Sequence, residues 1–308
     1  MNASPKYFPF IPQQTSIPNI IHFIYVGGRP FSFIHFLAVY MAKKINQPDC
    51  ILFHHTELPC GHWWEKAKPL LTLNPVEPVT EVYGNPVKYL AHMADVIRLA
   101  MLKQYGGIYL DLDVISLRPF TSLRQHDFVM GVEPGTGLCN AVILAKANSA
   151  FLHEWQQQYR SFDATRWNYH SVLLPWLLAQ QQPSQIHVVN KYAFFYPTHN
   201  DPVHRYLWGQ APSWKEKSVR ITKNLIKLFS GSHDMIRRSF YQTFHALYGV
   251  EWHYRQAQKS YCLHLWEGLW GECYLQAVTP EYLRHSPSNF ARLLRNHLSN
   301  EDLMQMEH

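Results

Sequence analysis

Two carboxylates, Asp111 and Asp113, stand directly after a short apolar run at residues 108–110. Side chains two residues apart on an extended chain point in the same direction, so this spacing predicts that both carboxylates converge on one point. Carboxylate oxygens suit a hard divalent cation such as Mg²⁺ or Mn²⁺, which keeps open positions for phosphate oxygens. An Asp-x-Asp sequence alone is weak evidence for a metal site, because most such pairs are solvated turn residues. The neighbouring sequence therefore has to support the assignment.

A helix and two glycines precede the carboxylate pair. Apolar residues recur every three or four positions between 90 and 105, which is the stripe of a helix that packs on a core. Asp95 and Arg98 share a different face of this helix and approach the same edge. Gly106 and Gly107 end the helix, because glycine adopts the left-handed cap conformation without a steric penalty. The acidic pair is a more specific signal for a ligand site when it follows a helix, a glycine pair and a buried strand in series.

The rest of the chain predicts an α/β domain around this unit. Residues 20–26 and 50–54 are short apolar runs typical of buried parallel strands, and a helix at 32–44 lies between them. Strand, helix and strand in this order indicate a parallel nucleotide-binding arrangement. Further strands are predicted at 79–83, 128–132, 141–145 and 186–189, further helices at 63–73, 149–160 and after 168, and a site-facing loop at 133–140.

Length and composition bound the class of protein. A chain of 308 residues with 47% hydrophobic residues can bury one large core. No apolar run approaches the roughly 18 to 20 residues of a membrane-spanning helix, and residues 1–15 lack the apolar centre of a signal peptide. Five cysteines without Cys-x-x-Cys spacing indicate reduced thiols rather than disulfides or zinc. We therefore expect a soluble chain, cytoplasmic or peripheral on the inner face of a bacterial membrane, or an exported effector.

Positive charge is concentrated in residues 210–260. This segment holds nine Lys/Arg and three Asp/Glu, and nine minus three gives +6, which equals the formal net charge of the chain. Its pattern predicts a basic helical insertion. Such a helix can contact an anionic membrane, although a solvated basic face is the commoner outcome. No nucleic-acid recognition motif accompanies the charge, so a nucleic-acid partner is not expected.

Three segments resemble one family, in the order that this family has them. Residues 94–114, ADVIRLAMLKQYGGIYLDLDV, resemble the sugar-binding DxD region of glycosyltransferase family 32 and of the large clostridial glucosylating toxins. IPNIIHFIYVGG at 17–28 is similar to their opening strand, and CLHLWEGLW at 262–270 to the closing segment of their metal site. The resemblance implies a single GT-A-type nucleotide-sugar-binding domain at 17–278, with a mainly parallel sheet flanked by helices, and a helical tail at 279–308.

The resemblance also implies a reaction and its residues. A retaining transferase would move a hexose from a nucleotide-sugar donor, with a UDP-sugar favoured over GDP-mannose, to a glycan, lipid or protein acceptor. Mn²⁺ or Mg²⁺ would neutralise the donor diphosphate. Asp111 and Asp113 are the implied catalytic carboxylates: Asp113 binds the ion directly, and Asp111 contacts donor hydroxyls and the ion through bound water. The further implied donor contacts are Ile24, Tyr25, Asp95, Arg98, Tyr109, Asn140 and Trp266. Read from the sequence pattern alone, Tyr25 and Tyr109 are also ordinary buried strand residues, and Asn140 an ordinary turn residue.

The closing segment departs from the toxins. They supply an acidic and a hydroxyl ligand at positions that would fall on Tyr261 and His264, and this chain retains neither type. Other DxD transferases use a histidine at the later position, and imidazole is acceptable to Mn²⁺, so His264 is predicted as the third ligand. In an extended stretch, His264 and Trp266 would face one side and Leu265 the core.

Two other function classes fit parts of the sequence. A haloacid-dehalogenase-like phosphatase also has Asp-x-Asp after an apolar strand. That family needs a second acidic pair at a strand end downstream, whereas the downstream aspartates here are isolated or lie in the polar tail. Its fold also opens with the motif, whereas at least two strands precede the motif here. A non-catalytic carbohydrate- or membrane-binding module could use the basic segment, but leaves the acidic pair unexplained.

Overall fold

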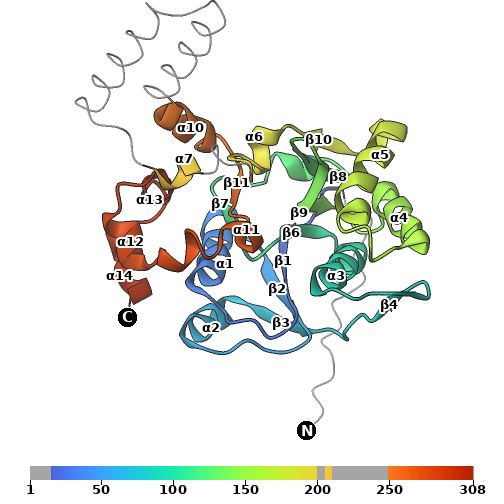
Figure 1. Cartoon of the computed structure of the whole chain (residues 1–308), viewed down its shortest axis with the longest axis horizontal. Coiled ribbons are helices and arrows are strands. Elements are labelled where there is room, and N and C mark those ends of the chain that lie inside the picture. Colours follow the sequence, from blue (N-terminus) through green and yellow to red (C-terminus); the bar gives the residue numbers. More distant parts are fainter. Residues whose placement is uncertain (1–14, 200–204, 210–248, 308) are drawn as a thin grey trace, which may run out of the picture.

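The computed structural model describes residues 15–199, 205–209 and 249–307. A seven-stranded sheet with the order β10-β8-β9-β6-β1-β2-β3 forms its centre (Figure 1). All neighbouring strands are parallel except at β9, which runs antiparallel to both β6 and β8. The predicted α/β class and mainly parallel sheet are therefore confirmed. The strands are β1 (Ile20–Tyr25), β2 (Cys50–His55), β3 (Thr72–Pro75), β6 (Gly107–Leu110), β8 (Phe128–Glu133), β9 (Gly137–Ala145) and β10 (His187–Val189).

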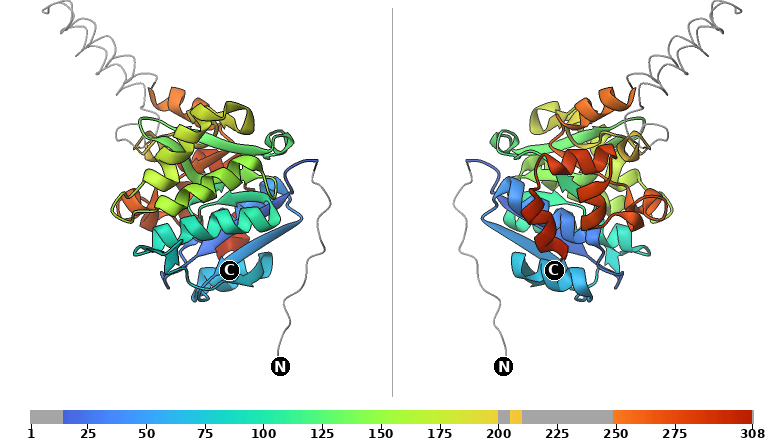
Figure 2. Two further views of the ribbon diagram at one scale, coloured as in Figure 1. Left: turned by 90° about the vertical axis from the view of Figure 1, so that its right-hand side faces the viewer. Right: turned by 90° about the vertical axis from the view of Figure 1, so that its left-hand side faces the viewer.

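Helices cover both faces of the sheet, and each face has its own apolar core (Figures 1 and 2). Successive residues of β1 divide between the two cores, with Phe23 in the first and Ile24 in the second, because side chains alternate along a strand. The first face carries α1 (Phe33–Asn46), α2 (His62–Ala67), α12 (Pro280–His285), α13 (Asn289–Arg295) and α14 (Asn300–Glu307); the second carries α3 (Leu90–Tyr105), α4 (Ala150–Gln157) and α5 (Leu174–Gln181).

The two glycines after α3 have separate structural roles. Gly106 ends the helix at φ 65°, and its N–H donates to the carbonyl of Leu102 at 2.8 Å. Gly107 begins β6 at φ 112°, where a Cβ atom would lie 2.6 Å from the carbonyl oxygen of Ile20 and 2.7 Å from Nε2 of His22. A side chain at Gly107 would therefore both strain the backbone and collide with β1.

A line of hydrogen-bonded polar side chains crosses β1, β2 and β3; the two histidines in it are buried, and Asn74 is half-buried. His22 Nε2 lies 2.7 Å from the carbonyl oxygen of Gly106, His22 Nδ1 lies 2.9 Å from His54 Nε2, and Asn74 Nδ2 lies 2.8 Å from His54 Nδ1. Because a carbonyl only accepts, His22 carries its proton on Nε2, so His54 donates to His22 and accepts from Asn74. Burial lowers the pKa of His22 to about 4, and burial together with the neighbouring His22 lowers the pKa of His54 to about 2.

Three predicted elements differ from the structure. The strand predicted at 79–83 is a separate hairpin, in which β4 (Glu81–Val82) pairs only with β5 (Asn85–Pro86). The helix predicted at 63–73 ends early, because Pro69 begins a tighter turn after α2, and β3 then adds to the sheet edge. The loop predicted at 133–140 is wrong as well: Asn140 lies within β9, which forms a hairpin with β8.

A small second sheet joins the end of the chain to its middle. β7 (Val114–Ser116) pairs antiparallel with β11 (Cys262–His264), so His264 lies opposite Val114. α6 (Lys191–Phe194) contacts β11, and α11 (Glu267–Trp270) follows β11 in the chain. α7 (Arg205–Trp208) contacts α10 (Val250–Ala257) and α13.

Most of the predicted basic insertion at 210–260 lies outside the described residues, so its helical structure and its membrane contact stay predictions. Among the helices that the structure does describe, none combines the length and the hydropathy needed to cross a membrane.

Candidate active site

A cavity of about 410 Å³ lies where β1 and β6 end, between the first turns of α3 and the start of α11. Asp111 and Asp113 both line it. The backbone between them is a tight turn, closed by the N–H of Val114 donating to the carbonyl of Asp111 at 3.0 Å, and not the extended stretch that the spacing predicts. The two carboxylates therefore reach the same cavity wall through a turn, and not through the predicted extended backbone.

His264 joins the two carboxylates from the far end of the chain, through the pairing of β11 with β7. One candidate ligand atom from each of Asp111, Asp113 and His264 lies within 4.8 Å of the others. His264 Nε2 lies 3.4 Å from Asp113 Oδ1, and the buried Nδ1 has no hydrogen-bond partner within the described part of the chain. Two carboxylate oxygens and an imidazole nitrogen are a donor set that fits Mn²⁺ or Mg²⁺.

The electrostatics of the cluster favour a cation. Burial alone would raise the pKa of Asp113, but His264 and the N–H of Glu267, which donates to Asp113 Oδ2 at 2.7 Å, outweigh it and lower that pKa to about 2. Burial would lower the pKa of His264, but Asp113 outweighs it, so that this pKa is raised. Asp113 is therefore ionised at neutral pH, and a cation would bind the neutral form of His264.

Arg98 connects α3 to the carboxylates and lines the cavity. Its Nη1 donates to the backbone oxygen of Asn140 at 2.7 Å and lies 3.3 Å from Asp111 Oδ1, while Nη2 lies 3.3 Å from Asp95 Oδ1. The guanidinium carbon is 4.4 Å from the centre of the Tyr109 ring. These contacts fix the planar guanidinium in one orientation.

Asp95 and Asn140 lie behind this arginine. Both are buried, and the amide of Asn140 donates to Asp95 Oδ1 at 2.7 Å. Burial raises the pKa of Asp95, although Arg98 and Asn140 oppose this shift. Neither residue lines this cavity, and both contact Arg98.

Tyr25 and Tyr109 line the cavity together with Ile24. The ring of Tyr25 is only 4% exposed and packs on Phe53 with a centroid distance of 6.0 Å. The hydroxyl of Tyr109 donates to Asp111, which adds a neutral donor to the charged contact from Arg98.

Trp266 also lines the cavity but reaches it by an unexpected backbone conformation. Its φ of 55° and ψ of 49° are left-handed, so the predicted extended stretch 264–266 is wrong. Leu265 is nonetheless fully buried, and the rings of His264 and Trp266 lie 3.9 Å apart between centroids. Left-handed conformations of large residues persist only where the surroundings impose them, and they cluster at functional sites.

The cavity residues that the sequence prediction missed include Glu267 and His35. His35 Nδ1 accepts the N–H of Ser32 in the N-terminal cap of α1, so its proton lies on Nε2, which is 3.1 Å from Glu267 Oε2. Glu267 lies within the segment 262–270 that resembles the closing segment of the family, and this resemblance could have indicated it as a site residue. His35 had none, because a histidine in a helix cap has no pattern that marks a site.

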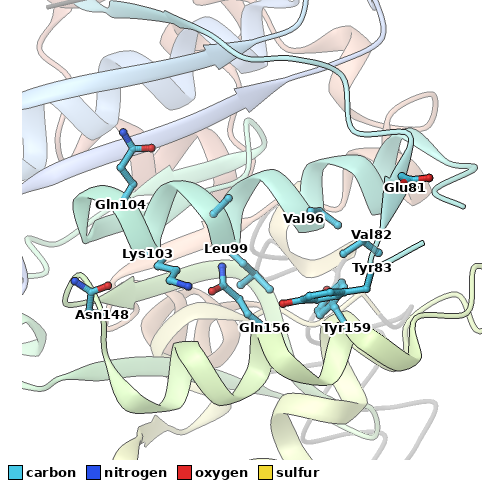
Figure 3. A pocket seen from close by; sticks show the side chains of 11 residues that line it. Glu81, Val82, Tyr83, Val96, Leu99, Lys103, Gln104, Asn148, Gln156 and Tyr159 are labelled. Atoms are coloured by element: carbon cyan, nitrogen blue, oxygen red, sulfur yellow. The ribbon is translucent and has the colours of Figure 1, made fainter. Parts of the chain in front are cut away.

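A second, larger cavity of about 730 Å³ lies on the other side of α3, between this helix, α4 and the β4–β5 hairpin (Figure 3). Tyr83 reaches across it from the hairpin, and Lys103 and Gln156 face it from the two helices. Glu81 is the single acidic residue of its described lining. This cavity therefore has no cation-binding set, and none of the predicted site residues lines it.

The fold and the site together define a class of enzyme. An Asp-x-Asp turn at a strand end, with an Arg–Asp pair on the preceding helix, is the arrangement that the family resemblance implies. Residues 39–129 match the family described as "Glycosyltransferase sugar-binding region containing DXD motif". The predicted resemblance and enzyme class are thus confirmed: the chain is a glycosyltransferase, and residues 39–129 are similar to this DXD-containing region.

Several known proteins are similar to parts or most of the chain. Glucan organizing enzyme 1 of Cryptococcus neoformans var. grubii serotype A is 29% identical over 304 residues, which cover 93% of this chain and 72% of that protein. The PaToxG glycosyltransferase structure overlaps 55% of this chain and 70% of its own, at 20% identity and a TM-score of 0.40. The glycosyltransferase domain of the YGT toxin overlaps 80% of this chain and 98% of its own, at 9% identity and a TM-score of 0.38. The enzyme class rests on the family match and not on these structural overlaps.

Proposed function

We propose that the chain is a metal-dependent, retaining glycosyltransferase that moves a hexose from a nucleotide sugar to an acceptor hydroxyl. A UDP-sugar is the first donor candidate and GDP-mannose the second. The observation that carries the proposal is the cluster of Asp111, Asp113 and His264, with ligand atoms within 4.8 Å of one another on the wall of a cavity of about 410 Å³. Cavities of this order accommodate small-molecule and cofactor ligands.

Asp113, Asp111 and His264 would hold Mn²⁺ or Mg²⁺. Such an ion, when bound, offsets the negative charge that grows on the departing nucleoside diphosphate. Arg98 would hydrogen-bond the donor sugar from the cavity wall, with Asp95 behind it to hold its guanidinium. Trp266 would cover the sugar or the diphosphate from α11.

The proposed reaction retains the configuration of the anomeric carbon. The bond from this carbon to the diphosphate oxygen breaks, the bond to the acceptor oxygen forms on the same face, and the acceptor proton leaves with the diphosphate. No enzyme nucleophile is required, and positioning supplies most of the rate. In support, the described carboxylates on the cavity wall already have partners: Asp113 pairs with His264, Glu267 with His35, and Asp111 with Arg98.

A glycan is the acceptor class that we propose, rather than a lipid or a protein. The name of the similar fungal protein, glucan organizing enzyme 1, supports this choice.

Calorimetry with nucleotide sugars tests the donor site. We expect donor binding that requires Mn²⁺ or Mg²⁺ and that is lost in Asp113→Asn while the fold survives. Asp127→Asn is a matched control, because the side chain of Asp127 is 70% exposed and pairs with Lys146 away from the cavity. Hydrolysis of the donor without acceptor gives a second readout. Unchanged affinity and metal dependence in Asp113→Asn would overturn the proposal.

A further inference from the structure

Two exposed aromatic side chains stand at the N-terminal end of α3, beside the active-site cavity. Trp167 is 58% exposed and Tyr89 is 48% exposed, and their rings lie 5.4 Å apart at an interplanar angle of 73°. Leu90, the next residue after Tyr89, lines the cavity and packs over Gly27 at the end of β1. The aromatic pair is thus continuous with the rim of the active site, and clustered exposed rings mark binding surfaces.

Buried polar contacts hold this pair in place. His92 is 2% exposed; its Nε2 lies 2.9 Å from the backbone oxygen of Trp167, and its ring lies 5.3 Å from Tyr89 and 5.1 Å from Trp167. The turn before Trp167 is closed by Asp163, whose Oδ1 accepts from the backbone N–H of Thr165 at 2.9 Å and from its hydroxyl at 2.7 Å. A ligand would therefore bind two rings that are already oriented, which lowers the entropy cost of binding.

The surroundings of the pair indicate the chemistry of the ligand. A pyranose has an apolar C–H face and a rim of hydroxyls, which matches an aromatic platform bordered by hydrogen-bonding groups. A lipid or protein surface would need a wider apolar patch than two rings and one leucine. Exposed polar residues that neighbour Trp167 in the sequence are Asp163, Thr165, Arg166 and Asn168.

We infer that Tyr89 and Trp167 form the platform that binds the acceptor glycan. One sugar unit stacks its C–H face on the ring of Trp167 and contacts Tyr89 beside it, because the two rings are nearly perpendicular. The adjoining unit extends past Leu90 into the cavity with its hydroxyl toward the donor. The inference rests on the proposed glycosyltransferase function and narrows its acceptor to an oligosaccharide. Tyr89 and Trp167 act on acceptor binding alone, because neither lines the donor cavity.

The test uses the full chain, tetrasaccharides of α- and β-linked glucose, and the variants Trp167→Ala, Tyr89→Ala and Trp167→Phe. We expect each alanine variant to raise the acceptor KM about tenfold, which is the loss of one aromatic contact of roughly 1.4 kcal/mol. Hydrolysis of donor without acceptor should not change, and Trp167→Phe should recover most of the affinity. Trp252→Ala is the matched control, since Trp252 is 39% exposed on α10.

Saturation-transfer NMR with the same tetrasaccharides gives a readout independent of catalysis. We expect saturation of sugar C–H protons in the native chain and in Trp252→Ala, and its loss in Trp167→Ala. The inference is overturned if the Tyr89→Ala/Trp167→Ala double variant keeps acceptor KM and saturation transfer within about twofold, or if the enzyme hydrolyses donor but transfers it only to a peptide or a lipid. Tetrasaccharide binding that needs Trp167, in a chain without any donor binding, would instead refute the proposed function and leave the glycan site standing.

Discussion

The buried pair His22 and His54 should make the stability of the protein depend on pH. Both imidazoles are neutral in the folded chain; His22 donates its proton to the carbonyl of Gly106, and His54 donates its proton to His22. Burial lowers the pKa of His22 from 6.5 to about 4. The unfolded chain therefore takes up a proton near pH 6.5, whereas the folded chain does not do so until the pH approaches 4. The stabilisation is complete above pH 6.5 and is lost as the pH falls toward 4.

The size of the effect follows from the shift. One pKa unit corresponds to about 1.4 kcal/mol, so the fall from 6.5 to about 4 gives about 3 kcal/mol for His22. This is a large part of the stability of an ordinary domain, about 5–15 kcal/mol. His54 adds to the loss, because its pKa is lowered further, in part by His22 itself.

Urea unfolding followed by circular dichroism at pH 7, 5.5 and 4 measures the effect. His22→Gln should be less stable than the native chain at pH 7, because a buried hydrogen-bond network is broken. Its further loss between pH 7 and 4 should be smaller than the native loss by at least about 3 kcal/mol. His62→Gln, a change at an exposed histidine, should follow the native curve. Parallel pH curves for the native chain and His22→Gln would refute the reasoning.

Two further predictions concern the metal site and the glycine pair. His264→Ala should weaken Mn²⁺ binding about tenfold or more in calorimetry, since it removes one of three candidate ligands, and unchanged affinity would exclude His264 from the site. Gly107→Ala should lower the free energy of unfolding by about 3 kcal/mol or more, because its Cβ would meet the backbone of Ile20 at a positive φ. Gly268→Ala, where a Cβ meets nothing within 4 Å, should change stability little, and equal urea midpoints for both variants would contradict this account.

The elements that the sequence predicts well have local signals. The stripe of α3, the glycine pair and the apolar β6 are legible within one segment, and together they place Asp111 at a strand end. β3 has no such signal, because its four residues lie at an incompletely buried sheet edge and become a strand only through pairing with β2. β7 is only three residues long and depends on β11, which follows far along the chain.

The candidate site likewise contains residues that a local sequence signal indicates and residues that have no such signal. A pattern of residues indicates Asp111 and Asp113, whereas the family resemblance indicates His264, and the β7–β11 pairing explains its position. Glu267 and His35 are 232 positions apart, and no periodicity links two residues that meet only through the fold of the whole chain. Asn140, predicted as a loop residue, lies within β9 and donates to Asp95 there.

The proposed donor and acceptor regions differ in how deeply their side chains are buried. Asp95, Asn140 and Asp113 are each 8% exposed and are held by charged or amide partners, so the donor end has a single arrangement of its polar groups. Removing one partner there leaves an uncompensated buried charge, which costs more than the contact contributed. Tyr89 and Trp167 are about half exposed, and among the described residues neither side chain takes part in an ion pair. Substitutions at the aromatic pair can therefore change acceptor choice without disturbing the donor end, and a change of acceptor specificity requires less reorganisation of this chain than a change of donor.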